Sequence, residues 1–262
     1  MPKSVFAIGA HPDDIEFVMA GTLLHLQAVG FEIHYMNVAN GCCGSTVTDA
    51  TETASIRLEE SRQAAGLIGA IHHPSIANDL EIMYDLQLLR KLAAVIREVK
   101  PSVILTHSPQ DYMEDHVNTC RLVVTAAFAR GMPNFQVTPN SPITDTRVTL
   151  YHAQPHGNCD ALGQPVVPSL FVDVTDVMDT KAEMLACHAS QKRWLDESQG
   201  MDSYIDSMRQ MSQAVGALSR NFAYAEGWRR HSHLGFCGEA DDPLTESLPP
   251  SIIHRVLANE VD

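Results

Sequence analysis

The chain has 262 residues, of which 45% are hydrophobic, and its formal net charge at pH 7 is −14. This length and composition suit one large α/β domain with a substantial core. A surface this acidic repels phosphates, so we expect neither nucleic acid nor an anionic membrane surface as a partner.

The cysteines and the apolar runs indicate the compartment. The six cysteines have no regular spacing and form no CxxC pair. This pattern argues against a disulfide framework and gives no sign of a thiolate zinc site. Residues 1–10 are too short for the apolar core of a signal peptide, and no apolar run is long enough for a membrane span. We therefore expect a cytoplasmic protein with reduced thiols.

The first half of the chain alternates segments typical of strands and of helices. Short apolar runs bounded by turn signals predict strands at 4–8, 32–39 and 102–107. Helical composition predicts helices at 16–29, 54–69, 85–99 and 116–130. Strands and helices that alternate at these lengths predict a Rossmann-like, mostly parallel sheet flanked by helices.

The second half is less regular. A loop rich in Pro and Asn at 133–146 precedes expected strands at 148–152 and 170–174, and helices after Thr175 and at 202–218. We read this half as an extension of the same domain, which gives one domain over 1–240. Residues 241–262 are expected to form a tail that packs loosely or against a neighbouring subunit of a homo-oligomer.

The tetrapeptide His11-Pro12-Asp13-Asp14 stands where the first strand ends and the first helix begins. Ligands bind at the carboxyl ends of strands in open parallel sheets. Imidazole and carboxylate are both good zinc ligands, so His11 and Asp14 are candidate ligands. Asp13 is then placed to exchange a proton with water. The alternative is a helix cap, because Asp13 and Glu16 together resemble a capping box.

A second acidic, histidine-containing loop follows the strand at 102–107. It ends in Asp115-His116, where the next helix begins. His116 is the third candidate ligand, while Asp111 and Asp115 are expected to accept hydrogen bonds from imidazole N–H groups. Capping by Asp115 is the alternative here. Two such loops at one edge of a sheet favour a metal site with an open coordination position.

These motifs resemble those of the LmbE-like, or PIG-L, deacetylases. The most specific matches are the stretch AIGAHPDD at 7–14 and the loop from Thr106 to His116. Supporting matches are IRLEE at 56–60, HASQ at 188–191 and YAE at 224–226. Together they cover the chain from about residue 4 to 236.

The resemblance implies hydrolysis of an N-acetyl group, usually on a glucosamine-type sugar or its conjugate. It also implies that His11, Asp14 and His116 bind zinc and that Asp13 is the general base. Sites with two histidines and one carboxylate also accept Fe²⁺, so the sequence does not fix the metal. A nucleotide-binding Rossmann domain is disfavoured, because GxGxxG is absent after the first strand.

The chain departs from the family at one position. Members commonly have HPDH before the helix, where this chain has Met113-Glu114-Asp115-His116. The family's first histidine helps to stabilise the tetrahedral intermediate, and methionine cannot donate a hydrogen bond. Loss of one such donor typically costs about 100- to 1000-fold in turnover. Candidate replacements are Tyr112, His152 and His156.

The expected site therefore has three groups of residues. Catalytic residues are Asp13, Asp115 and Tyr112; substrate contacts are Arg57, His152 and His156; metal ligands are His11, Asp14 and His116. For Arg57, a structural ion pair with Glu60 or another nearby acid is the alternative.

The departure at Met113 leaves three hypotheses open. The first is a zinc-dependent N-deacetylase of an amino sugar. The second is an amidase that acts on a different conjugate, such as a thiol-sugar. The third is a metal-binding homologue with impaired or no turnover.

Overall fold

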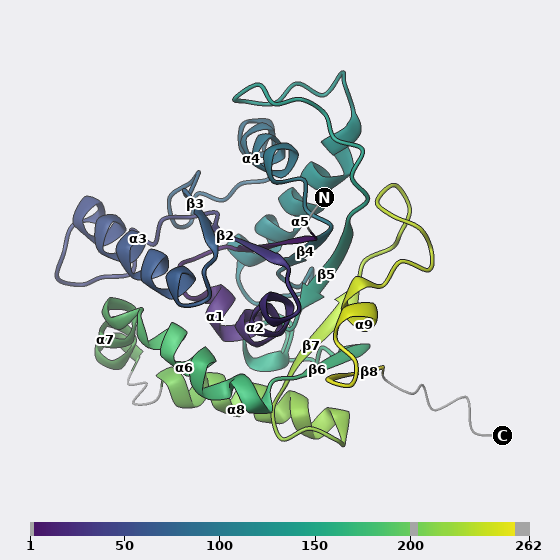
Figure 1. Ribbon diagram of the computed structural model, residues 1–262. Coiled ribbons are helices and arrows are strands. Elements are labelled where there is room, and N and C mark those ends of the chain that lie inside the picture. Colours follow the sequence, from purple (N-terminus) through teal and green to yellow (C-terminus); the bar gives the residue numbers. More distant parts are fainter. Residues whose placement is uncertain (1–2, 200–203, 255–262) are drawn as a thin grey trace.

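The computed structural model of the chain describes residues 3–199 and 204–254 (Figure 1). In these residues, eight strands form one mixed sheet in the order β3-β2-β1-β4-β5-β7-β6-β8. The strands are β1 Ser4–Gly9, β2 Glu32–Asn37, β3 Ile71–His73, β4 Val103–Thr106, β5 Thr149–Ala153, β6 Leu170–Asp173, β7 Ala225–Arg230 and β8 Ile252–His254. The helices are α1 Asp14–Val18, α2 Ala20–Ala28, α3 Ala50–Leu67, α4 Leu86–Val99, α5 Glu114–Phe128, α6 Met178–Ala186, α7 Ala189–Gln199, α8 Tyr204–Ser219 and α9 Pro243–Ser247.

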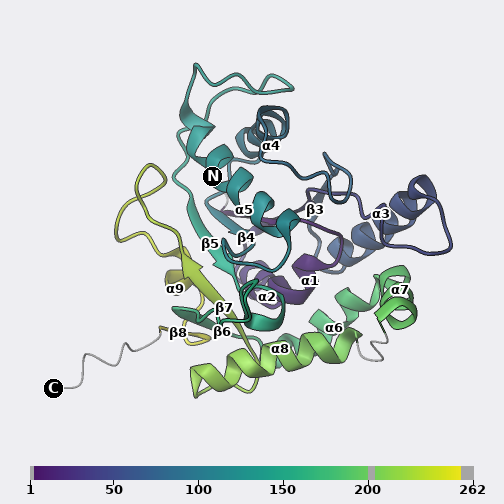
Figure 2. The same ribbon diagram turned by 180° about the vertical axis from the view of Figure 1, so that it is seen from behind.

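The central strands are buried on both faces because their side chains alternate between two cores. In β1, Val5 and Ala7 belong to the core shared with α1, α2, α6 and α8. Phe6 and Ile8 belong to the core shared with α4 and α5. Figures 1 and 2 show these two helical layers on opposite sides of the sheet. The expected Rossmann-like α/β fold is confirmed.

The sheet direction changes after β5. Strands β3, β2, β1, β4 and β5 are parallel, whereas β7, β6 and β8 continue the sheet in antiparallel pairing. The chain runs from β1 outwards to β3 and then returns to β4 on the other side of β1. The carboxyl ends of β1 and β4 therefore flank a topological switch point, where open α/β sheets bind ligands.

Several elements differ from the sequence-based expectation. Strands β3 and β7 were not expected, and the helix expected at 16–29 is divided at Met19, whose φ of −134° is not helical. The Glu226 carboxylate accepts hydrogen bonds from the backbone N–H groups of Gly21 and Thr22, both at 2.8 Å. These contacts satisfy free donors at the start of α2, so a residue about 200 positions away sets this helix boundary.

The expected loose tail is partly wrong. Within 241–254, Leu244 is fully buried in the core and β8 pairs with β6. Residues 255–262 lie outside the described residues, and the domain boundary at 240 stays a prediction. Over 3–199 and 204–254, no helix combines the length and apolar character needed to cross a bilayer.

Candidate metal centre

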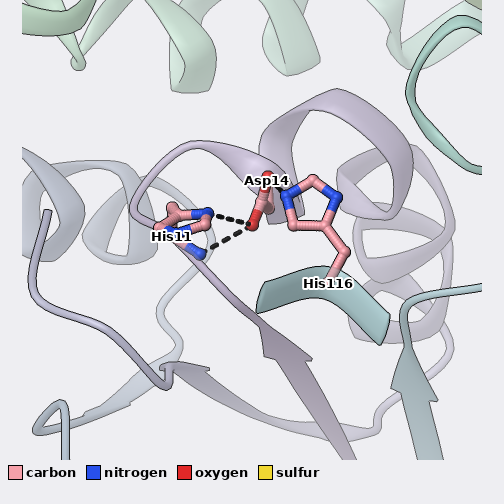
Figure 3. A group of neighbouring side chains, drawn as sticks. All are labelled: His11, Asp14 and His116. Carbon is pink, nitrogen blue, oxygen red and sulfur yellow. Dashed lines mark hydrogen bonds and ion pairs between the residues drawn. The ribbon is translucent and has the colours of Figure 1, made fainter. Parts of the chain in front are cut away.

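Three predicted ligands meet at the switch point (Figure 3). His11 lies in the turn after β1, Asp14 is the first residue of α1, and His116 is in the first turn of α5. One ligand atom from each residue lies within 4.8 Å of the others. We call these three residues the metal cluster. Figure 3 shows the Asp14 carboxylate between the two imidazole rings.

Two further carboxylates orient the imidazoles. His11 Nε2 lies 2.9 Å from Asp115 Oδ2, so Nε2 carries the proton and Nδ1 is left on the side of Asp14. His116 Nδ1 lies 3.0 Å from Asp111 Oδ1, which leaves Nε2 3.3 Å from Asp14 Oδ1. With these partners, Nδ1 of His11 and Nε2 of His116 are the nitrogens that would bind a metal once they lose their protons.

The charges in the metal cluster shift one another's pKa values. Burial acts to lower the pKa of His11, but hydrogen bonds to Asp115 and Asp14 outweigh it and raise the pKa to about 9. Burial likewise opposes the rise of the His116 pKa to about 10, which is driven mainly by Asp14. Burial acts to raise the pKa of Asp14, yet the neighbouring imidazoles hold it well below its usual range.

The donor set fits a divalent cation. Two imidazole nitrogens and one carboxylate leave coordination positions for water and substrate, as in catalytic zinc sites. His107 is also close, with its ring stacked on His116 at 4.2 Å. However, His107 Nε2 accepts the backbone N–H of Ala10 at 2.8 Å. His107 therefore stabilises the turn after β1. Its Nε2 also lies 3.2 Å from Asp14 Oδ2, and His107, Asp111 and His116 form a second candidate set of ligands.

Asp13 does not act as a helix cap. Its φ is 111°, and its side chain makes no capping hydrogen bond. Instead, Asp13 Oδ2 accepts a 2.5 Å hydrogen bond from the Tyr204 hydroxyl on α8 and lies 3.5 Å from Arg57 Nη2. Oδ1 accepts no hydrogen bond from any described residue. Burial raises the pKa of Asp13, although the Arg57 guanidinium opposes the rise.

Arg57 lies behind Asp13. Its side chain is buried, and it donates to the carbonyl oxygen of Pro12. The alternative of an ion pair with Glu60 or another nearby acid holds for the nearby acid, Asp13. The Glu60 carboxylate instead accepts hydrogen bonds from the backbone N–H and the hydroxyl of Ser190. Arg57 therefore supports the turn that carries Asp13.

The three candidate replacements for the missing histidine lie in different surroundings. His152 is buried, and both of its ring nitrogens are occupied, by the carbonyl of His107 at 3.0 Å and by His231 at 2.9 Å. The structure thus does not support a substrate contact by His152. Tyr112 is 58% exposed and packs edge-on against His116.

His156 is the candidate whose imidazole remains free. It follows β5 and is half-buried, and its ring lies 6.0 Å from Tyr112 and 5.2 Å from Phe17. Phe17 in turn packs against Tyr204 at 5.1 Å. Among the described residues, no side chain or backbone group forms a hydrogen bond to the His156 imidazole. His156 therefore lies between two aromatic side chains: Tyr112, which contacts His116, and Phe17, which contacts Tyr204 beside Asp13.

Tyr204 was missed by the sequence analysis. It lies 191 residues from Asp13 and in a segment read only as helix. Nothing in its local sequence distinguishes it from a core tyrosine. Only the packing of α8 against α1 brings its hydroxyl to the carboxylate.

Comparisons with known proteins point to the family that the sequence motifs resemble. Residues 6–127 match the PIG-L family, described as GlcNAc-PI de-N-acetylase. The diacetylchitobiose deacetylase of Thermococcus kodakarensis is 28% identical over 199 residues, which cover 72% of this chain and 70% of that protein. The 4-oxalmesaconate hydratase of Pseudomonas putida is 27% identical over 237 residues, covering 86% and 88%.

A solved structure supports the fold. The N,N'-diacetylchitobiose deacetylase of Pyrococcus horikoshii superposes with a TM-score of 0.73 at 24% identity, covering 89% of this chain and 85% of that one. The family resemblance inferred from the sequence motifs is confirmed by the PIG-L match over residues 6–127 and by the deacetylase relatives.

Proposed function

This chain carries a PIG-L/LmbE-like family domain, and from that premise we propose that it is a metal-dependent hydrolase that removes the N-acetyl group of an N-acetylglucosamine-type sugar or conjugate. The observation that carries the proposal is the convergence of His11, Asp14 and His116 beside a buried carboxylate with one free oxygen, that of Asp13. Relatives named as deacetylases supply the substrate class.

Zinc is the proposed metal. The cluster offers two imidazole nitrogens and a carboxylate, a set that zinc binds with an open position for catalysis. Fe²⁺ accepts the same donors, so the metal in the cell depends on supply as well as on affinity. When bound, the cation lowers the pKa of a water molecule and polarises the acetyl carbonyl.

Side chains of the protein then transfer the proton of the attacking water to the leaving amine. Asp13 Oδ1 is free to take a proton from the attacking water and to return it to the leaving amine. Tyr204 and Arg57 hold the other oxygen and the turn, so that Asp13 keeps one orientation. Asp115 faces His11 Nε2 rather than the ligand side of the cluster, so we assign it a positioning role in place of the expected catalytic one.

We assign to His156 the hydrogen bond that Met113 cannot make. Its imidazole is free and half-buried beside Tyr112, whereas His152 has both nitrogens occupied. Burial lowers the pKa of His156, so the ring is neutral at pH 7 and donates through one N–H. Tyr112, which packs edge-on against His116 and is 58% exposed, is assigned to the substrate entrance.

We also place the enzyme in the cytoplasm, as a homo-oligomer. The location is supported by all six cysteines being free thiols, including the adjacent Cys42 and Cys43. The oligomer is supported by exposed apolar side chains between β3 and α4, namely Leu80, Met83 and Tyr84.

The test of the function is acetate release by the zinc-loaded protein from a panel of N-acetylglucosamine conjugates. We expect Asp13→Asn to retain zinc but to lose about 100- to 10,000-fold in kcat. We expect His11→Ala to lose both zinc and activity. Unchanged activity in either variant would refute the assignment, and zinc binding without hydrolysis of any acyl amide would indicate an impaired homologue.

A second candidate function is the addition of water to an unsaturated acid. The Pseudomonas putida hydratase aligns over a larger share of this chain than the Thermococcus kodakarensis deacetylase does, 86% against 72%, at nearly the same identity. The absence of the family histidine at Met113 also weakens the argument for acyl transfer alone. Asp13 and the metal cluster suit water activation in both reactions.

Mass spectrometry separates the two candidates. Deacetylation releases acetate and leaves a free amine, whereas hydration adds one water to the substrate and releases nothing. A panel of N-acetyl sugars, other amide conjugates and unsaturated acids, assayed with the same zinc-loaded protein, therefore also tests the amidase alternative.

A further inference from the structure

Two adjacent thiols lie in the loop after β2, outside the metal cluster. Cys42 and Cys43 follow Gly41, and their Sγ atoms are 3.9 Å apart. Cys43 is exposed and Cys42 is half-buried, so both can be reached from solvent. The proposed reaction uses neither thiol.

A carboxylate from a distant segment fixes this loop. Asp79 Oδ1 accepts the backbone N–H of Gly41 at 2.7 Å, and Oδ2 accepts that of Cys43 at 3.0 Å. Each carboxylate oxygen keeps a second lone pair. One ligand atom each from Cys42, Cys43 and Asp79 lies within 4.8 Å of the others.

The geometry favours a shared cation over a disulfide. Adjacent Cα atoms are about 3.8 Å apart, whereas disulfides usually join Cα atoms at about 4.4–6.8 Å, so a bond between Cys42 and Cys43 would be strained. By contrast, two sulfur ligands at about 2.3 Å from a tetrahedral ion are about 3.8 Å apart. The observed separation of 3.9 Å matches this second arrangement.

The local charge also favours a cation. The neighbouring acids are Asp79 and Glu81, and the whole chain carries a net charge of −14. Burial, followed by the Cys42 thiol and these acids, raises the pKa of Cys43 to about 11. A protonated thiol reacts slowly with oxidants, whereas a thiophilic ion displaces the proton.

We propose that Cys42, Cys43 and Asp79 form a second metal site, separate from the metal cluster, that binds a thiophilic divalent cation such as Cd²⁺ or Zn²⁺. We call these three residues the dithiol site. No CxxC motif marks this site, because its two cysteines are adjacent and its third ligand lies 36 residues after Cys43.

The dithiol site lies next to Arg57, the side chain that pairs with the proposed base, Asp13. Gly41 has a φ of +77°, and a Cβ there would stand 2.5 Å from Arg57 Cδ. Its backbone therefore packs directly on the side chain that holds Pro12 and pairs with Asp13. An ion bound to Cys42 and Cys43 would thus fix the loop on which Arg57 rests.

The test is a titration of the metal-free, fully reduced protein with Cd²⁺, followed by ultraviolet absorption and by the bound metal per chain. We expect two equivalents to bind, one of them with a thiolate-to-metal charge-transfer band. Cys42→Ser/Cys43→Ser should lose that band and one equivalent. Asp79→Asn should keep the band but weaken this site at least about tenfold.

Two controls make the result specific. Cys159→Ser, which removes a half-buried thiol outside the dithiol site, should leave the band and both equivalents unchanged. His11→Ala should lose the other equivalent and keep the band, so failure of the metal cluster and failure of the dithiol site give different results. An unchanged band and stoichiometry in a folded Cys42→Ser/Cys43→Ser variant, checked by thermal unfolding, would overturn the proposal.

Discussion

Asp14 illustrates how much of this site is determined by single side chains. One carboxylate lies within 3.6 Å of a ring nitrogen from each of three histidines, and it also accepts the backbone N–H of His11 at 2.6 Å. His11 and His116 form the metal cluster with Asp14. Their second partners, Asp115 and Asp111, orient the two rings from the opposite nitrogens.

Asp115→Asn tests this positioning role. The variant replaces the charged acceptor that orients His11, so the metal affinity should fall about 10- to 100-fold while the fold persists. Isothermal titration with Zn²⁺ in a competing chelator measures the change. The matched control is Glu114→Gln, because Glu114 is the exposed neighbour of Asp115 in the same helical turn. Equal affinities in the two variants would contradict the role.

The pKa values of His11 and His116 predict a pH dependence. Without metal these values are raised to about 9 and about 10, so both rings are protonated at pH 7 and compete with the cation. Metal affinity should therefore increase as the pH rises from 6 to 9. A pH series of the same zinc titration measures it, and an affinity that falls over this range would exclude the mechanism.

The same shifts predict the stability of the metal-free protein. A histidine whose pKa is raised on folding adds stability below its unfolded pKa of about 6.5. That contribution is lost as the pH passes the folded values of about 9 and about 10. Thermal unfolding in chelator should therefore show a Tm that decreases from pH 7 to pH 10. The metal-loaded protein, in which the imidazole rings are neutral throughout, should not share this decrease.

At the level of elements, local sequence signals predicted β1, β2, β4, β5 and β6 but missed β3, β7 and β8. Apolar runs with turn signals located β1, β2 and β4 to within two residues at each end. Strand β7 was missed because its sequence, AEGWRR, lacks an apolar run: Glu226 and the two arginines are held by partners elsewhere in the fold. The break between α1 and α2 was missed for the same reason, since Glu226 supplies the contacts.

Glu226 also carries a buried ion pair that joins β7 to α6. Lys181 Nζ lies 2.6 Å from Glu226 Oε1, and both side chains are almost fully buried. Lys181→Met would leave Glu226 charged and unpaired, so we expect a loss of about 3–5 kcal/mol in the free energy of unfolding. Denaturation in urea measures it.

The control for this prediction lies on neighbouring helices. Arg209 on α8 pairs with the exposed Asp179 on α6 at 2.8 Å, so Arg209→Met should cost only about 0–1 kcal/mol. A pH series adds a second check. Burial acts to raise the pKa of Glu226, but Lys181 holds it below its usual range. The pair therefore stabilises the protein above pH 4.5, and this stability is lost as the pH falls through the lowered value.

At the level of the whole molecule, the sequence predicted the residues of the metal cluster better than the limits of the domain. The ligands lie in short motifs with strong local signals, whereas the end of the domain depends on which distant surfaces a segment covers. Residues 243–254 were read as part of a loose tail, yet α9 and β8 complete one edge of the sheet. Tyr204 escaped notice for the same reason, because its role depends on packing alone.

Leu244→Ala tests whether this last segment is integral to the fold. Leu244 is fully buried in the core shared with α2 and α6, so the cavity should cost about 2–5 kcal/mol. Leu162→Ala is the control, because Leu162 is 85% exposed and its loss should cost less than about 0.5 kcal/mol. Similar midpoints of thermal unfolding for the two variants would indicate that this segment packs loosely and does not stabilise the fold.

The order of these residues along the chain has an evolutionary consequence. The metal cluster and its two orienting carboxylates lie before residue 120, within the region that matches the family. Tyr204 and His156, which border the proposed base and the entrance, come from the later half. Substitutions in the later half are therefore expected to change substrate contacts more readily than metal binding, because the two sets of residues occupy separate parts of the chain.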